Sequence, residues 1–176
     1  MNGQLSFQIG DKVVYPNHGV GIIEQISSRL IGPTVQKFYL LTIKASSLKV
    51  EVPCNNVGNV GLRRVVKNGE INKIMDFLTD GKCDSNTDWK DRFKENSDKM
   101  RTGSLLEVAV VLKSLLVLAR LKPLSFREKK MLDRARYLLV TELAMARNTQ
   151  EVEIEELLNR ALAKNKLKFP EVTEES

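Results

Sequence analysis

The fold is decided at residues 60–78, which read VGLRRVVKNGEINKIMDFL. The start of this stretch is rich in β-branched valine and is typical of a short strand. From Gly69 onward the apolar residues recur at helical spacing, at Ile71, Ile74, Met75 and Leu78. This spacing predicts a helix, so we expect the chain to change from β structure to helices at about Val66.

The residues before this junction favour four or five short strands. Their β-branched and aromatic runs are separated by turn residues such as Gly32-Pro33, and Pro16 ends the first run because proline cannot donate to a ladder. A set of short strands in this length predicts a small barrel of the SH3 or Tudor type, in which closure removes exposed edges. The expected strands cover residues 13–15, 20–26, 37–43, 48–53 and 60–65.

The residues after the junction predict helices. The clearest start signal is Ser125 with Glu128 three residues later, which matches the capping-box pattern. Apolar residues at helical spacing, with proline or glycine at the breaks, complete the assignment. The expected helices cover residues 69–78, 89–102, 105–121, 126–147 and 149–162.

The expected fold class is therefore α+β, with a small N-terminal Tudor/SH3-like β-barrel followed by a compact all-α domain. We place the barrel at residues 1–66 and the helical domain at residues 67–168. The acidic end of the chain, residues 169–176, is expected to fray.

Composition favours a globular protein over a membrane or metal protein. Of the 176 residues, 42% are hydrophobic and 28% are charged, and no run approaches the roughly 20 apolar residues of a membrane span. The chain starts without the basic and apolar regions of a signal peptide, so we expect it to be cytoplasmic. Cys54, Cys83 and His18 do not have the spacing of metal ligands, and we expect no metal and no cofactor.

Positive charge is concentrated in one part of the helical half. Residues 82–147 contain 15 Lys+Arg and 9 Asp+Glu, whereas residues 148–176 contain 4 and 7. Such asymmetry is typical of a protein with a polyanionic partner. The basic segment also contains the only tryptophan of the sequence, Trp89.

Trp89 has two interpretations. Tryptophan is highly buried on average, which favours a core role. At helical spacing, however, Trp89 shares a face with Phe93, and the cations around it include Lys90, Arg92 and Lys94. An aromatic surface ringed by cations is what a nucleic-acid wedge or stacking platform needs.

A second basic run lies in the helix that begins after Ser125. In most helices such a run is a solvated face, but phosphate binding is also built from scattered cations. Both interpretations stay open, and Lys129, Lys130 and Arg134 are the candidate DNA contacts. The whole run consists of Arg127, Lys129, Lys130, Arg134 and Arg136.

Two stretches together resemble one family. Residues 9–21, IGDKVVYPNHGVG, and residues 89–96, WKDRFKEN, are similar to the CarD/CdnL bacterial transcription regulators, and residues 124–132 and 135–144 continue the match. The first module also occurs in transcription-repair coupling factors. This chain is too short for helicase motors and has no GxxxxGK[ST] loop, so a stand-alone regulator is the better match.

The resemblance implies a protein that clamps two partners. In that family the barrel binds a lobe of the RNA polymerase β subunit by pairing strand edges, and the helical domain contacts promoter DNA at the upstream edge of the melted −10 region. Carried over, Trp89 is the wedge in the minor groove that slows collapse of the bubble. Lys90, Arg92 and Lys94 become phosphate contacts with little sequence specificity.

The same resemblance implies polymerase contacts at Arg29, Glu51 and Pro53. Two positions depart from the family. Relatives can carry arginine at Glu51 and a basic residue at Asp91, so these two positions bear on the strength and geometry of binding.

Two other classes of function are weighed against this one. A protein-interaction adaptor would keep the barrel but bury Trp89 and make no DNA contact. An enzyme would need a pocket with titrating groups, for which His18 is the sole obvious candidate. We expect no catalytic residue, and we expect a monomer associated with the nucleoid through RNA polymerase.

Overall fold

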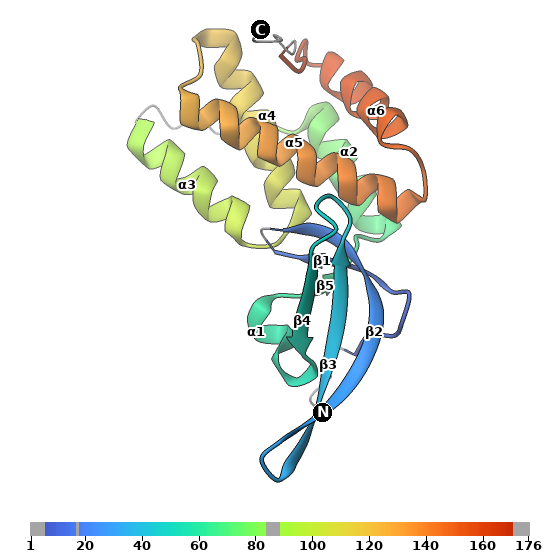
Figure 1. Ribbon diagram of the computed structural model, residues 1–176. Helices are drawn as coiled ribbons and strands as arrows, with labels where there is room; N and C mark the ends of the chain where they lie inside the picture. Colours follow the sequence, from blue (N-terminus) through green and yellow to red (C-terminus); the bar gives the residue numbers. More distant parts are fainter. Residues whose placement is uncertain (1–5, 17, 84–88, 171–176) are drawn as a thin grey trace, which may run out of the picture. The chain divides into compact units, whose positions relative to one another are not determined.

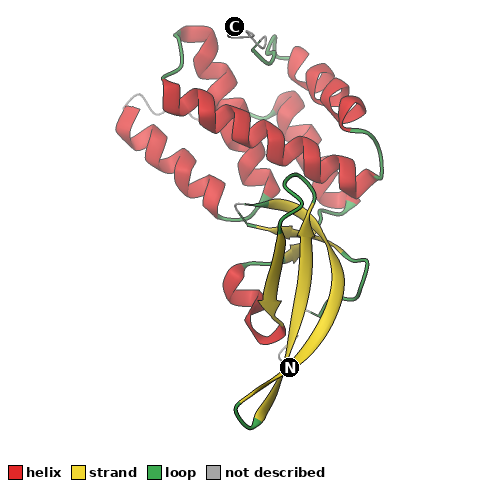
Figure 2. Ribbon diagram, in the orientation of Figure 1, coloured by secondary structure: helices red, strands yellow, loops and turns green. Residues whose placement is uncertain are grey.

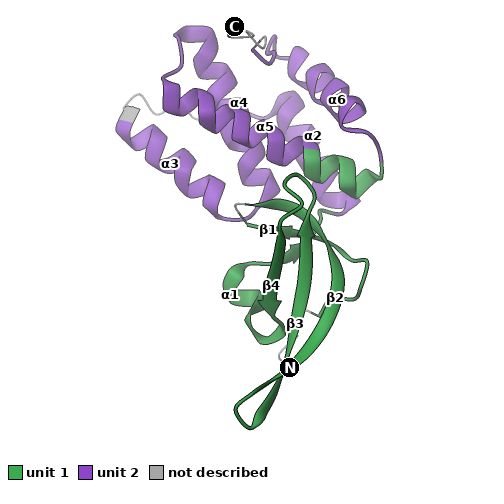
Figure 3. Ribbon diagram, in the orientation of Figure 1, with its two compact units in different colours: residues 1–66, 141–148 green, residues 67–140, 149–176 purple. Residues whose placement is uncertain are grey.

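The computed structural model describes residues 6–16, 18–83 and 89–170. The chain is an α+β protein that divides into two compact units (Figure 3). One unit contains residues 1–66 and 141–148, and the other contains residues 67–140 and 149–176.

The first unit is built on an antiparallel sheet that has five strands in the described residues (Figure 1, Figure 2). β2 and β3 form a long hairpin, in which Gly32 takes a positive φ of 62°. Glycine at the first central position suits a two-residue hairpin turn. The hairpin is longer than the sequence predicts, because pairing continues to Ile31↔Thr34 beside this turn. The strands are β1 (Lys12–Tyr15), β2 (Gly19–Ile31), β3 (Thr34–Ile43), β4 (Lys49–Pro53) and β5 (Arg63–Arg64).

The sheet is open, so the expected closed barrel is not seen. The strand order is β4-β3-β2-β1-β5, and no ladder joins β4 to β5 in the residues that the structure describes. β5 pairs with β1 over only two residues, which offer too few backbone groups to close a sheet. The Arg64 guanidinium holds this short strand by a contact of 2.8 Å with the Asp11 carboxylate.

One face of the sheet packs into an apolar core. The core joins residues of all the longer strands to Val57 of α1 (Val57–Val60), the short helix between β4 and β5. At Gly21 a Cβ atom would lie 2.7 Å from the Thr42 carbonyl oxygen, so glycine is required where β2 approaches β3. The buried members are Phe7, Val13, Ile23, Tyr39, Leu41, Val52, Val57 and Leu62.

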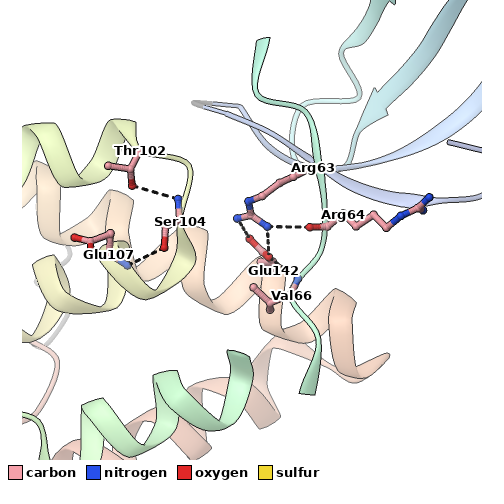
Figure 4. Close-up of polar contacts among 7 residues, drawn as sticks. All are labelled: Arg63, Arg64, Val66, Thr102, Ser104, Glu107 and Glu142. Carbon is pink, nitrogen blue, oxygen red and sulfur yellow. Dashed lines mark hydrogen bonds and ion pairs between the residues drawn. The ribbon is translucent and has the colours of Figure 1, made fainter. Parts of the chain in front are cut away.

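The last turns of α5 (Phe126–Arg147) belong to the same unit as the sheet. The Glu142 carboxylate accepts two hydrogen bonds of 2.7 Å from the Arg63 guanidinium and one of 2.8 Å from the Val66 N–H (Figure 4). Met145 packs against Val14 and Val20. These contacts group residues 141–148 with the sheet, whereas the sequence boundaries assign them to the helical domain.

The second unit is helical, and the sequence predicts the bounds of its helices to within a few residues. α4 is buried on more than one side, as the apolar residues on more than one face of this helix indicate. Its N-terminus is capped by Ser104, whose Oγ accepts the Glu107 N–H at 3.4 Å (Figure 4). Besides α5, the helices are α2 (Asn68–Asp80), α3 (Trp89–Arg101), α4 (Leu105–Leu121) and α6 (Glu151–Ala163).

Packing in this unit continues beyond α6. Leu167 and Phe169 are buried, and the Arg136 guanidinium carbon lies 4.2 Å from the Phe169 ring centroid. The expectation that the chain frays from residue 169 is therefore wrong for Phe169 itself. Pro170 is exposed, and residues 171–176 of the expected tail lie outside the described residues.

Candidate functional site

The three residues implied as polymerase contacts lie together on one face of the sheet. Arg29 on β2 forms an ion pair with Glu51 on β4. The Arg29 guanidinium carbon lies 4.2 Å from the ring centroid of Phe38 on β3, and Phe38 is in register with Pro53 on β4. Glu51 and Pro53 are two residues apart and so share a face of the strand. Phe38, which the sequence analysis does not single out, stands at the centre of this cluster.

The charge of Glu51 is balanced within the chain. Its side chain is 47% exposed and that of Arg29 is 53% exposed, so their ion pair contributes at most about 1 kcal/mol to stability. The larger effect of the pair is on local charge, because the Glu51 carboxylate already has a cationic neighbour. A partner surface would meet a nearly neutral cluster.

β4 presents an open edge beside this cluster. It is the first strand in the order β4-β3-β2-β1-β5, and within the described part of the chain it pairs with β3 on one side only. An edge strand offers unpaired N–H and C=O groups to a strand from another chain. The chemistry available here is therefore main-chain hydrogen bonding, framed by the Arg29, Glu51 and Pro53 side chains.

The tip of the β2–β3 hairpin adds an apolar surface that the sequence analysis missed. Leu30 is 75% exposed, and its cross-strand partner Val35 is 61% exposed. Ile31 beside them is also exposed. Clustered exposed apolar residues mark contact sites. The available signal was the run of apolar residues on both sides of Gly32-Pro33, which the sequence analysis used only as a separator.

The second predicted site begins at the first residue of α3, Trp89, whose side chain lies outside the described residues. Lys90 and Lys94 are exposed and one helical turn apart, so they lie on the same face of the helix. These two cations stand where the sequence analysis expects them, on the surface of the basic segment.

Arg92 stands elsewhere, because its side chain is only 10% exposed. Its Nη2 and Nε atoms lie 3.3 and 3.4 Å from Oε2 of Glu128 on α5, and the Glu128 side chain is 3% exposed. Asn96, one turn further along α3, is buried as well. The inner face of α3 therefore contains Arg92, and the expectation of a surface cation at this position is wrong.

Glu128 joins this ion pair to the start of α5. Its Oε1 accepts the Ser125 N–H at 3.3 Å, and its own N–H donates to Ser125 Oγ at 3.2 Å. The predicted capping box is thus confirmed. One buried carboxylate caps α5 and also binds the guanidinium of Arg92 on α3, which fixes the two helices to each other.

The first turns of α5 carry cations beside aromatic rings. The Arg127 guanidinium carbon lies 6.0 Å from the Phe93 ring centroid on α3, and Lys130 Nζ lies 4.6 Å from the Phe126 ring centroid. Lys129 is exposed next to them. These distances are within or at the limit of cation–π contacts.

The other two arginines of this run are less accessible. Arg134 is partly buried, with its guanidinium carbon 5.6 Å from the Tyr137 ring centroid. Arg136 contacts Glu155 at 3.2 Å in addition to the ring of Phe169. Among the predicted DNA contacts, Lys90, Lys94, Lys129 and Lys130 are therefore the exposed cations, and Arg134 is intermediate.

No group of metal-binding side chains was found among the described residues. His18 is exposed, with its ring centroid 4.9 Å from that of Tyr15, and both cysteines are free thiols. Within the described ranges, no helix has both the length and the apolar character needed to cross a membrane.

Comparisons with known proteins match both halves of the chain. Residues 7–66 match the CarD-like/TRCF RID domain, and residues 73–159 match the CarD C-terminal domain. The putative transcription factor YdeB of Bacillus subtilis (strain 168) is 36% identical over 148 residues, which are 84% of this chain and 97% of YdeB. CdnLNt from Myxococcus xanthus is a solved structure with 39% identity and a TM-score of 0.30, and the match covers 38% of this chain and 93% of that one.

Proposed function

Because the chain belongs to the CarD/CdnL family of transcription regulators, we propose that it holds RNA polymerase and promoter DNA at the same time. RNA polymerase is the partner of the family's N-terminal module. We assign the polymerase β subunit to the sheet and promoter DNA to the helical part. Trp89 then acts as a wedge at the upstream edge of the melted −10 region and stabilises the open complex.

The edge strand β4 supports the polymerase contact. A strand of the β subunit that pairs there would add main-chain hydrogen bonds to the open edge. Arg29, Glu51 and Pro53 border this edge around Phe38, and the exposed hairpin residues Leu30 and Val35 supply apolar area. The open sheet therefore offers a free strand edge for pairing, which a closed barrel would lack.

The basic surface of α3 and α5 supports the DNA contact. Lys90, Lys94, Lys129 and Lys130 are exposed, and we assign them to phosphates. Such contacts position a protein on DNA and do not read sequence, so binding to free DNA should be weak and of low specificity. Arg92 is left out of this set, because its guanidinium is buried against Glu128. Its role in the proposal is to hold α3 on α5.

We assign the wedge to Trp89, which is the first residue of α3. A planar side chain that enters a widened minor groove offsets an unstacking cost of a few kcal/mol. A protein that binds the open complex more tightly than the closed one shifts the population toward the open state by that difference in affinity. About 1.4 kcal/mol of preference lengthens the open state about tenfold.

The observation that carries the proposal is the concentration of exposed lysines around the start of α3 and α5, in a chain whose other half presents an open strand edge. The adaptor alternative explains the edge but gives no function to the lysines. The two proposals differ in whether the open complex lives longer when the protein is bound.

The test is the lifetime of open promoter complexes formed by the organism's own RNA polymerase. We expect the wild-type protein to lengthen the lifetime about tenfold and Trp89→Ala to remove most of this gain, because the wedge is lost. Polymerase binding should persist in Trp89→Ala. Val152→Ala on α6, which removes an exposed apolar side chain, serves as the control and should behave as wild type.

Two outcomes would contradict the proposal. An unchanged lifetime with bound wild-type protein would favour the adaptor. If wild type lengthened the lifetime and Trp89→Ala did so equally, the protein would still be a regulator, but Trp89 would not act as the wedge.

A further inference from the structure

The first residue of α5 is an exposed phenylalanine. Phe126 is 70% exposed, and an isolated exposed apolar residue needs no explanation. The setting of this one is different, because Lys130 Nζ lies 4.6 Å from its ring centroid. The ammonium holds the ring by a cation–π contact, and most of the side chain still faces solvent.

The surface around Phe126 is positively charged. Arg127, Lys129 and Lys130 are exposed, whereas the acidic residue among them, Glu128, is 2% exposed and turned toward Arg92. The negative charge of this turn is therefore inside and paired. What remains outside is an aromatic ring among three cations.

This turn is firmly placed within its unit. The Ser125–Glu128 capping box fixes the start of α5, and the Arg92–Glu128 pair fixes α5 against α3. Arg127 also lies 6.0 Å from the Phe93 ring centroid on α3. Phe126 therefore sits on a surface that is continuous with the helix that begins at Trp89.

We propose that Phe126 is a second aromatic contact to promoter DNA, packed against the deoxyribose of the backbone while Lys129 and Lys130 bind the adjacent phosphates. The inference rests on the proposed function and deepens it. A DNA backbone alternates apolar sugars with anionic phosphates, and an apolar ring flanked by cations is complementary to both. The contact reads no base, so it strengthens binding at any promoter sequence.

The first test compares open-complex lifetimes with full-length variants and RNA polymerase. Phe126→Ala should reduce the roughly tenfold gain in lifetime about threefold, as expected for loss of a phenylalanine that DNA buries only in part. Val152→Ala, the matched exposed apolar residue in the first turn of α6, should have no effect. Phe126→Trp should retain the gain.

Salt separates an apolar contact from a phosphate contact. The loss in Phe126→Ala should be nearly the same at about 50 and 200 mM salt, whereas the loss in Lys129→Ala should shrink, because fewer counterions are released by the variant. A salt dependence equal to that of Lys129→Ala would overturn the sugar contact.

A photoreactive phenylalanine analogue at position 126 identifies the partner. Crosslinks to promoter DNA support the inference, and crosslinks to a polymerase subunit alone overturn it. Suppose that wild type lengthens the open-complex lifetime and Trp89→Ala does not. If the lifetime with Phe126→Ala then equals that with Val152→Ala, the inference fails and the proposed function stands. If wild type has no effect on the lifetime, the proposed function fails first.

Discussion

At the scale of the single residue, Lys113 is a lysine whose side chain is buried. It is 2% exposed on α4, and its Nζ donates to the carbonyl oxygens of Phe77 at 2.8 Å and Gly81 at 2.6 Å. These carbonyls lie at the C-terminal end of α2, where a helix leaves acceptors unsatisfied. Burial lowers the pKa of Lys113, because desolvation disfavours the charged form.

This shift predicts a pH dependence of stability with a definite sign. Between the folded-state pKa and the ordinary value of 10.5, the unfolded chain binds more protons than the folded chain at Lys113. The free energy of unfolding of wild type should therefore rise with pH in this window, relative to Lys113→Met. Urea unfolding of both proteins, from neutral pH upward, measures the difference.

The exposed residue Lys129 provides the control for this measurement. Lys129→Met removes a lysine that is exposed in the folded state, and its unfolding is measured over the same pH range for comparison. A wild-type advantage over Lys113→Met that falls as the pH rises would contradict the assignment.

At the scale of the elements, features set by neighbouring residues could be predicted better than contacts between residues far apart in the sequence. The Ser125–Glu128 capping box lies within one turn, so the start of α5 could be predicted from the sequence and is confirmed. The burial of Arg92 depends on Glu128, 36 residues away, and no spacing rule connects them. The open edge of the sheet likewise depends on how short β5 is, which a turn pattern does not reveal.

The same limit applies to the candidate site. The sequence analysis expected Lys90 and Lys94 among the cations around Trp89, and both are exposed. It did not indicate Phe38, because the cluster around this ring needs the register of three strands. Arg29, Glu51 and Pro53 came from resemblance, and their proximity could not be derived from composition or periodicity.

The ion pair between Glu142 and Arg63 joins the last turns of α5 to β5, and it leads to a prediction about stability. The Glu142 side chain is 3% exposed and satisfies both the Arg63 guanidinium and the Val66 N–H. Glu142→Ala should lower the free energy of unfolding by about 3–5 kcal/mol, because it leaves a partly buried charge and a buried donor without this acceptor. Chemical denaturation of the full chain measures the loss.

The matched control is the more exposed ion pair between Arg136 and Glu155, where the acidic side chain is 40% exposed. Glu155→Ala should cost less than about 1 kcal/mol. Equal losses in the two variants would show that burial does not distinguish these carboxylates.

At the scale of the whole molecule, net charge agrees with the proposed DNA partner but does not identify the contacting residues. The sequence carries a net charge of +6, and most of the excess lies in the segment with α3 and the start of α5. Burial then divides these cations into two groups. Lys94 and Lys129 are exposed, whereas Arg92 is paired inside, so equal charges should make unequal contributions to DNA binding.

The salt dependence of binding to promoter DNA should separate these groups. Lys94→Gln and Lys129→Gln should each reduce the slope of log K against log salt by about 1, because each removes one of the proposed phosphate contacts. Arg92→Gln should lower the free energy of unfolding by about 3–5 kcal/mol, because Glu128 loses its buried cation. Measured where this variant is still folded, its slope should remain that of wild type. If Arg92→Gln reduced the slope as much as Lys94→Gln does and left the stability unchanged, the result would contradict the buried role of Arg92 and assign this residue to the DNA-binding surface.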